Sequence, residues 1–183
     1  MTEALATFFR YTISQVEHLV TLEDELANIE NYYYIQQYRF GDKLTLSIEY
    51  ERDDDDFSEL EVLRYRLPKL TLQPIVENAI HHGAMKRERG VGKVTVQVKR
   101  EEKSTRIDVI DNGPGMDYRI IQSLYGGEKV EHTGIGLMNV QKRLVSIYGK
   151  GYGLQIVSGE TGTNVRMNIP HQEVKYHEDC DCG

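Results

Sequence analysis

Three short clusters in this sequence contain the residue types from which a nucleotide site could be built. They read ENAIHHG at residues 77–83, DNGPGM at residues 111–116 and TGIGLMNV at residues 133–140. In the second cluster, Gly113 and Gly115 allow backbone angles that are closed to other residues, and they let a flat ligand approach the chain. Asp111 would offer a carboxylate acceptor to an exocyclic amine. The second cluster therefore predicts a site for a base.

The third cluster is suited to phosphate. Gly134 and Gly136 stand at the start of a predicted helix, where free backbone N–H groups attract anionic oxygens. Each cluster alone is a weak indicator, because short glycine-containing motifs recur by chance. A base at one loop and phosphates at the other together favour a nucleotide as the ligand.

The first cluster places polar side chains one helical turn apart. Glu77 lies four residues before His81, and Asn78 lies four residues before His82, so each pair shares a helical face. The Asn78 oxygen suits a magnesium ion that keeps most of its waters and bridges phosphates. Taken alone, Asn78 is better explained as an amide bonded to neighbouring main chain. The other two clusters shift the balance towards the metal.

The apolar patterns predict the elements that would position these clusters. Helical spacing predicts helices over residues 5–40 with a break near 19–22, where Thr21 and Asp24 resemble a capping box and Gly41 ends the second helix. Tyr32 to Tyr34 are interpreted as packing between this helix and the domain. Further helices are predicted over 70–83, within 117–133 and over 134–148, with Pro74 in a first turn. Alternation predicts strands over 43–50, 93–100, 105–111, 153–159 and 164–170.

The order of these elements is too irregular for repeated strand–helix units. It favours an α+β fold, a two-layer α/β sandwich with a mixed sheet, preceded by N-terminal helices. GKGYGL at residues 149–154 imitates a dinucleotide fingerprint but leads into a strand, so a turn is predicted there. The acidic run at residues 53–56 lacks the spaced ligands of a calcium loop and is interpreted as solvated.

Composition excludes several functional classes. No apolar run approaches the roughly 20 residues that span a bilayer, and no signal-peptide pattern is present. The net charge of −7 disfavours a nucleic-acid partner bound by broad electrostatics. Cys180 and Cys182 cannot staple a core, which fits a reducing compartment. We therefore expect a soluble, intracellular chain whose acidic end, residues 171–183, is disordered, with soft-metal binding by the two cysteines as the alternative.

Together and in this order, the clusters resemble the Bergerat-type (GHKL) ATP-binding domain shared by sensor histidine kinases, Hsp90, type II topoisomerases and MutL, over residues 67–170. More narrowly, the chain resembles bacterial sensor histidine kinases of the YesM/LytS type. The segments that carry this resemblance are LPKLTLQPIVENAIHHG, DNGPGM, GIGLMNVQKRL and GTNVRMNIP, preceded by VTLEDELANIENYYYIQQYRFGDKL. The resemblance implies an enzyme that binds ATP and Mg²⁺. It would pass the γ-phosphoryl group to a histidine and onward to the receiver domain of a response regulator.

The resemblance also implies roles for individual residues. Asn78 would hold Mg²⁺, with Glu77 and His81 beside it as catalytic residues, and Asp111 would read the adenine amino group. Asn139 and Arg143 belong to the third motif without a settled role. The implied cofactor-binding residues are Asn78, His81, His82, Asp111, Gly113, Gly115, Met116, Gly134, Ile135, Gly136, Leu137 and Thr163.

Two positions depart from the family pattern. The family commonly has lysine at the position of His81, so a phosphate contact there should be weaker and more sensitive to pH. The hydrolytic members place a water-activating glutamate where this chain has Pro74, which cannot act as a base, so fast ATP hydrolysis is not expected. His82 matches a usual histidine, and a packing role for it stays open.

The phosphate-accepting histidine of this family lies in a motif like NPHFLFN, which does not occur in the sequence, and His18 stands at a position that the family does not use. We expect a truncated piece that binds ATP without autophosphorylating. Residues 1–40 would be the end of the dimerisation helices and a linker helix, 41–170 the ATP-binding catalytic domain and 171–183 the tail. The intact protein would be a homodimer whose cytoplasmic part this is, reaching the inner or plasma membrane only through N-terminal segments absent here.

Residues 117–133 would form a lid over the nucleotide, with Gly126 and Gly127 as its hinge. Other functional classes stay open at this point. One is a stand-alone ATP-binding regulator resembling anti-sigma serine kinases. Another is a GHKL ATPase of the Hsp90 or MutL kind, and a third is an interaction module with an inactive nucleotide pocket.

Overall fold

A five-stranded mixed sheet forms the centre of the protein, and its strand order is β2-β4-β5-β7-β6. The computed structural model describes residues 2–13, 19–51, 58–126 and 135–171. Strands β2 and β4 run parallel, and the other neighbours run antiparallel. The predicted α+β sandwich with a mixed sheet is therefore confirmed. The strands are β2 (Leu44–Glu51), β4 (Gly92–Arg100), β5 (Ser104–Asp111), β6 (Gln155–Gly159) and β7 (Gly162–Pro170).

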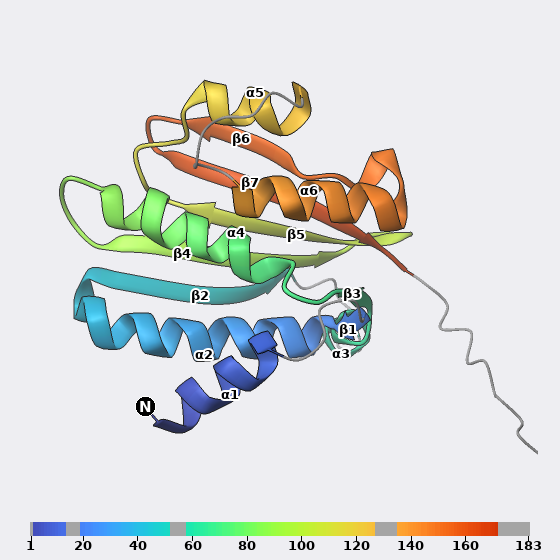
Figure 1. Cartoon of the computed structure of the whole chain (residues 1–183), viewed down its shortest axis with the longest axis horizontal. Helices are drawn as coiled ribbons and strands as arrows, with labels where there is room; N and C mark the ends of the chain where they lie inside the picture. The colour runs from blue at the N-terminus through green and yellow to red at the C-terminus, as the bar shows by residue number, and fades with distance from the viewer. Residues whose placement is uncertain (1, 14–18, 52–57, 127–134, 172–183) are drawn as a thin grey trace, which may run out of the picture.

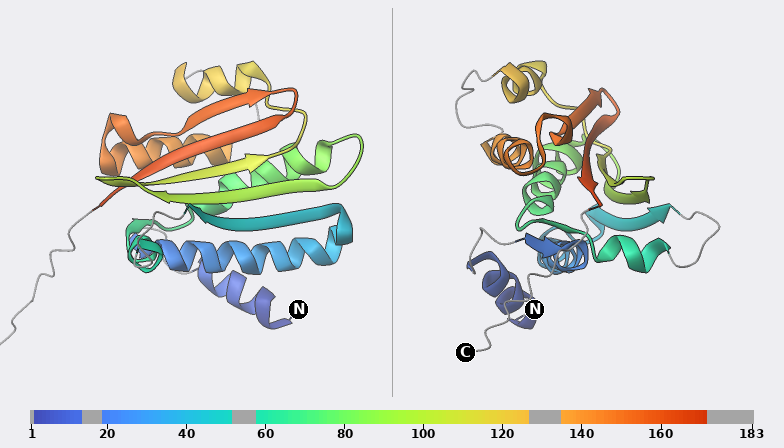
Figure 2. Two further views of the ribbon diagram at one scale, coloured as in Figure 1. Left: turned by 180° about the vertical axis from the view of Figure 1, so that it is seen from behind. Right: turned by 90° about the vertical axis from the view of Figure 1, so that its right-hand side faces the viewer.

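Helices α4 (Leu72–Asn78) and α6 (Ile135–Tyr148) cover one face of the sheet (Figures 1 and 2). Helix α2 (Leu22–Phe40) runs beside the outer strand β2, and α1 (Thr2–Ile13) packs on α2. Two further helices in the described part of the chain are α3 (Ser58–Leu63) and α5 (Tyr118–Gly126). Among the described residues, no helix is both long and apolar enough to cross a membrane.

The strands alternate as the sequence predicted. In β2, Leu44 is buried and Leu46, Ile48 and Tyr50 are half-buried, whereas the residues between them are exposed. A pleated strand places successive side chains on opposite faces, so this pattern turns one face towards the helices. In the last hairpin, the predicted turn over residues 160–163 was too long, because β7 already begins at Gly162, which pairs with Gly159. The first strand of this hairpin begins at Gln155, two residues later than predicted.

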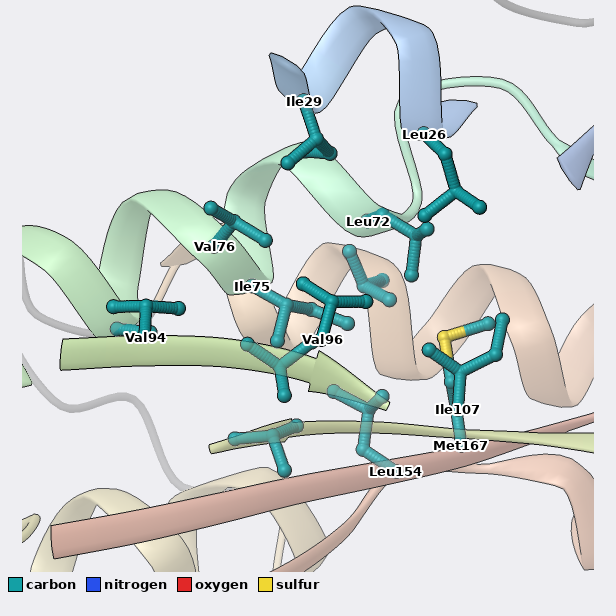
Figure 3. Close-up of a cluster of buried hydrophobic side chains, with 14 of the residues drawn as sticks. Leu26, Ile29, Leu72, Ile75, Val76, Val94, Val96, Ile107, Leu154 and Met167 are labelled. Carbon is teal, nitrogen blue, oxygen red and sulfur yellow. The ribbon is translucent and has the colours of Figure 1, made fainter. Parts of the chain in front are cut away.

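One hydrophobic core joins the helices to the sheet (Figure 3). Leu26 and Ile29 of α2 lie over the side chains of α4, and Ile107 and Met167 come from the sheet beneath. All four are at most 4% exposed. Burial of apolar surface at about 25 cal/mol per Å² makes this cluster the main source of stability. The buried side chains of α2 therefore belong to the same hydrophobic core as those of α4.

The capping box predicted at the start of α2 is confirmed. The Asp24 N–H donates to the Thr21 side chain, and the Thr21 N–H donates to the Asp24 carboxylate. At the other end, Gly41 adopts a positive φ of 56°, which glycine allows without strain. The predicted break before α2 contains an element that the sequence did not reveal: β1 (Leu19–Thr21) pairs antiparallel with β3 (Arg66–Pro68).

Helix α4 changes form at its end. The predicted helix over 70–83 begins at Leu72, so Pro74 does lie in its first turn, but residues Ala79–Gly83 form a π-helical turn. Short 3-10 turns follow at Ala84–Lys86, and elsewhere at Gly41–Lys43 and Lys150–Tyr152. The acidic run 53–56, Gly127, Gly134 and the end of the chain from residue 172 lie outside the described residues.

Candidate nucleotide site

A cavity of about 250 Å³ lies where the ends of β5 and β7 meet the π-helical turn. Asp111, the last residue of β5, forms one wall, and Thr163 of β7 stands beside it. We call this cavity the base side of the site. Its lining residues are Asn78, His82, Gly83, Lys86, Asp111, Gly115, Met116, Asp117, Ile120 and Thr163.

Asp111 is a buried carboxylate, only 5% exposed. Its Oδ1 accepts a hydrogen bond from the Gly113 N–H at 2.8 Å, and the main chain of Thr163 supplies a second bond. Burial raises the pKa of Asp111, and these two main-chain donors oppose the shift. The carboxylate is thus fixed by the backbone and faces the cavity, where a ligand amine would be a suitable further donor.

Glycines around Asp111 make room for protein atoms rather than for ligand alone. A Cβ on Gly83 would overlap the Asp111 carboxylate, and a Cβ on Gly113 would overlap the main chain of Gly83. Gly115 has a positive φ of 89° and lies against the Gly159 carbonyl. Gly113 is thus behind the cavity wall, whereas Gly115 lines the cavity.

A small hydroxyl network holds the loop after β5. The Met116 N–H donates to Ser158 Oγ at 2.7 Å, and Ser158 Oγ lies 2.9 Å from Thr163 Oγ1. Thr163 is 4% exposed, so its hydroxyl needs such a partner. Ser158 was not predicted from the sequence, since a serine in a strand carries no motif.

A second cavity, of about 260 Å³, adjoins the first and shares Asn78 and His82 with it. It opens between α4 and the start of α6, where a Cβ on Gly136 would stand 3.3 Å from Pro74 Cβ. We call it the phosphate side of the site. Its lining residues are Pro74, Glu77, Asn78, His81, His82, Ile135, Gly136 and Leu137.

The π-helical turn carries both histidines of the first motif. π turns are rare and concentrate at functional sites. The predicted i, i+4 pairs remain together despite the wider turn, because Asn78 and His82 line both cavities and Glu77 and His81 line the phosphate side.

His81 is held by a residue of α2. Its Nε2 lies 3.0 Å from the Tyr32 hydroxyl, and its ring meets the edge of Phe40. Burial lowers the pKa of His81, Arg39 lowers it further, Glu77 raises it and His82 lowers it. The imidazole is therefore neutral at pH 7, which makes it a hydrogen-bond donor without the full charge of a lysine.

Mg²⁺ binding can be tested against the donors at the phosphate side. The structure groups no three metal-binding carboxylate, thiol or imidazole side chains within the described ranges. The oxygen donors here are the Asn78 amide and the Glu77 carboxylate, one oxygen of which accepts from Gln73 at 2.8 Å. Such a set fits a hard cation that keeps its waters and takes further oxygens from phosphates. It does not suit a cation that needs a full protein cage.

The cavities bring together most of the residues predicted from the sequence. Every described residue of the predicted binding set except Gly113 lines one side or the other. Tyr32 and Tyr33 pack as predicted, but Tyr34 is 53% exposed, so that part of the prediction is wrong. Four lining residues had been given no individual role, namely Gly83 in the first motif, Asp117 and Ile120 in the predicted lid, and Lys86, which no motif indicated.

Comparison with known families gives two matches. The histidine kinase-, DNA gyrase B- and HSP90-like ATPase family matches residues 65–173, which include both cavities. A second family, described as histidine kinase, matches residues 1–44.

Curated relatives match nearly the whole chain. The chain is 37% identical over 171 residues to the sensor histidine kinase YesM of Bacillus subtilis (strain 168), covering 93% of this chain and 27% of that protein. It is 36% identical to the sensor histidine kinase YpdA of Escherichia coli (strain K12), covering 92% and 28%. The chain thus spans about a quarter of the length of these relatives.

Solved structures share the fold at low sequence identity. The catalytic domain of the histidine kinase ThkA matches with a TM-score of 0.59 at 15% identity, over 84% of this chain and 94% of that one. ThkA in complex with the response regulator protein TrrA matches with a TM-score of 0.62 at 15% identity, over 93% and 47%.

Proposed function

Since the chain belongs to the histidine kinase-, DNA gyrase B- and HSP90-like ATPase family, we propose that it is the ATP-binding catalytic part of a sensor histidine kinase. The full-length protein would transfer the γ-phosphoryl group of ATP to a histidine and then to an aspartate of a response regulator. Relatives named as sensor histidine kinases, 36–37% identical over most of the chain, support this role.

The single observation that carries the proposal is the placement of Asp111. A buried carboxylate stands at the end of one cavity, and Asn78 joins that cavity to a second one with oxygen donors and a helix start. Asp111 would accept from the adenine amino group, and the Thr163 hydroxyl would lie close to the base. Gly115 and Met116 would border the ring, and Gly113 would hold the loop in place.

On the phosphate side, Asn78 would hold Mg²⁺ with Glu77 beside it. The ion supplies charge neutralisation on the phosphate oxygens, because phosphoryl transfer asks mainly for positioning and electrostatics. Ile135, Gly136 and Leu137 would present the start of α6 to the phosphates, continuing from Gly134. His81 would contact phosphate oxygens as a neutral donor, and His82 would contact them beside it.

The family role implies partners and a division of the chain. We propose a response regulator receiver domain as the acceptor partner, and the match to a kinase solved with its response regulator supports this choice. Residues 1–40 would be the end of the dimerisation helices of a homodimer, 41–170 the catalytic domain and 171–183 a tail. The full-length protein would be a membrane protein with this part in the cytoplasm.

Hydrolysis of ATP by the isolated chain should be slow. Pro74 lines the phosphate side at the position where hydrolytic members of the superfamily carry a glutamate. A proline cannot activate water, so bound ATP should persist. No NPHFLFN-like motif occurs in the sequence, and the chain alone should bind ATP without labelling itself.

Titration calorimetry tests the proposal. The chain should bind Mg·ATP more tightly than Mg·GTP, and Asp111→Asn should weaken ATP roughly 10–100-fold, because hydrogen bonds to charged groups contribute about 1.5–3 kcal/mol. Asn78→Ala should remove the dependence of binding on Mg²⁺. Equal affinity for the two nucleotides, or an unchanged metal requirement in Asn78→Ala, would refute the proposed site.

A further inference from the structure

One face of α2 carries polar side chains that are buried. Glu25, Asn28 and Tyr32 are 1%, 3% and 6% exposed, and their spacing of three and four residues places them on one side of the helix. Buried polar groups need hydrogen-bond partners. Each of the three contacts α4, its π-helical continuation or the residues just before it. Figure 3 shows the same two helices packed through Leu26 and Ile29.

Glu25 fixes the beginning of α4. Its carboxylate accepts from the backbone N–H groups of Leu70, Thr71 and Leu72 at 2.7, 2.9 and 2.8 Å. The Arg143 guanidinium of α6 donates to the Leu70 carbonyl at 2.7 Å from the other side. Leu70 itself has a φ of 56°, an uncommon conformation that these contacts hold in place.

Asn28 reaches the phosphate side through one intermediary. Its Nδ2 donates to Gln73 Oε1 at 2.9 Å, and Gln73 Nε2 donates to Glu77 Oε1 at 2.8 Å. The carboxylate next to Asn78 is therefore oriented by a relay of amides that starts on α2.

Tyr32 reaches the phosphate side directly. Burial and the charge of Glu77 raise the pKa of Tyr32, so its hydroxyl keeps its proton. His81 is neutral, so a hydroxyl that donates to Nε2 leaves the ring proton on Nδ1. Among the described residues, Nδ1 makes no hydrogen bond.

We propose that Tyr32 is a positioning residue of the nucleotide site: by donating to His81 Nε2, it fixes the ring so that Nδ1–H donates to a phosphate oxygen of bound ATP. The inference rests on the proposed function and deepens it. Tyr32 lies outside the segment that matches the ATPase family, residues 65–173, so α2 contributes to the site from beyond the family's own domain.

The first measurement is nucleotide affinity by calorimetry. Tyr32→Phe removes only the hydroxyl and keeps the ring that packs on Phe8, while Tyr34→Phe, at an exposed position of the same helix, is the matched control. Tyr32→Phe should weaken Mg·ATP about fivefold, the effect of one neutral hydrogen bond. Its affinity for adenosine should stay unchanged, because the base side is untouched. Tyr34→Phe should bind both ligands as the parent chain does.

Two further readouts separate positioning from general stability. Nitrogen NMR of the His81 ring should show the proton on Nδ1 in the parent chain and a shift towards Nε2 in Tyr32→Phe. In a His81→Ala background, Tyr32→Phe should have no additional effect on Mg·ATP affinity. Other charged and titratable groups also face His81, namely Arg39 of α2 and Glu77 and His82 of its own helix. The affinity for Mg·ATP should therefore be compared among variants at one fixed pH.

The outcomes distinguish this inference from the proposed function. If Mg·ATP binds but Tyr32→Phe matches the parent chain, or weakens adenosine equally, the positioning role is wrong and the ATP site stands. A proton on Nε2 in the parent chain also overturns the inference. If the parent chain binds no Mg·ATP, the proposed function fails, and the inference fails with it even if the nitrogen shifts show the Tyr32 bond.

Discussion

The two sides of the site are built in different ways. On the base side, Asp111 is fixed by main-chain donors. Glycines without side chains also let the π-helical turn, the loop after β5 and the end of β6 come into contact around it. On the phosphate side, Glu77 and His81 are held by side chains whose hydrogen bonds lead back to α2. One side is therefore set by backbone packing within the domain, and the other depends on where a neighbouring helix lies.

This difference indicates how the two halves of a nucleotide could be treated separately. A shift of α2 would disturb Glu77 and His81 on the phosphate side while leaving the Asp111 carboxylate in place. Under the proposed function, recognition of adenine would then persist while the placement of the phosphates varied. The predictions below test that separation.

The largest effect is expected from Gly113→Ala, which attacks the base side. The new Cβ would overlap the Gly83 main chain, and neither segment can move without displacing Asp111. We expect a loss of about 3 kcal/mol or more in the free energy of unfolding. Chemical denaturation would measure it.

Gly159→Ala is the matched control for that change. Gly159 ends β6 close to the same loops, but a Cβ there meets no atom within 4 Å and its φ is not positive. Its stability should stay within about 0.5 kcal/mol of the parent chain. Equal losses for both variants would show that the base side is not packed through its backbone.

An intermediate effect is expected from Glu25→Gln, which loosens the link between α2 and α4. An amide has one acceptor oxygen, so at least one buried N–H among residues 70–72 loses its partner. This should cost about 2 kcal/mol of stability and weaken Mg·ATP more than adenosine. Glu23→Gln removes the same negative charge at an exposed position of the same helix and should leave both affinities unchanged. Equal weakening of both ligands by Glu25→Gln would contradict the separation.

The smallest effect is a pH dependence of opposite sign on the two sides. The lowered pKa of His81 means that neutral His81 stabilises the fold above about pH 6.5, and this contribution is lost as the pH falls through the lowered value. The raised pKa of Asp111 acts in reverse, because the fold gains stability as the pH falls through the raised value.

Thermal unfolding between pH 7 and pH 4 checks these signs. Relative to the parent chain, His81→Gln should lose less stability in the upper part of this range. Asp111→Asn should lack the gain on the acid side. Parallel profiles for all three chains would show that neither group titrates differently in the folded state.

The same contrast explains what the sequence could predict. Asp111 and Gly115 could be predicted because they lie in a short motif that directly follows a predicted strand, and Thr163 because it lies in a segment that resembles the family. Glu25 and Asn28 lie in a segment that resembles the family, but the resemblance gave them no role, and the partners that tie them to the start of α4 lie 45 residues or more along the chain. Tyr32 was predicted to pack, but its bond to His81 depends on how α2 docks.

Local form was predictable where the sequence shows a period or a capping motif. The alternating strands and the capping box at Thr21 were confirmed. The ladder between Leu19–Thr21 and Arg66–Pro68 was missed, since three residues are too few to show alternation. The π-helical turn was also missed, because its apolar residues fit an ordinary helix nearly as well.

The short ladder of β1 with β3 has a practical consequence for hybrid proteins built from this chain. Together with the hydrogen bond from the Leu22 N–H to the Tyr65 carbonyl, this ladder fixes the start of α2 to the segment around β3. A foreign input module should therefore be spliced on before Leu19. A splice after Phe40 would give the ATP-handling unit a borrowed helix with none of the required contacts.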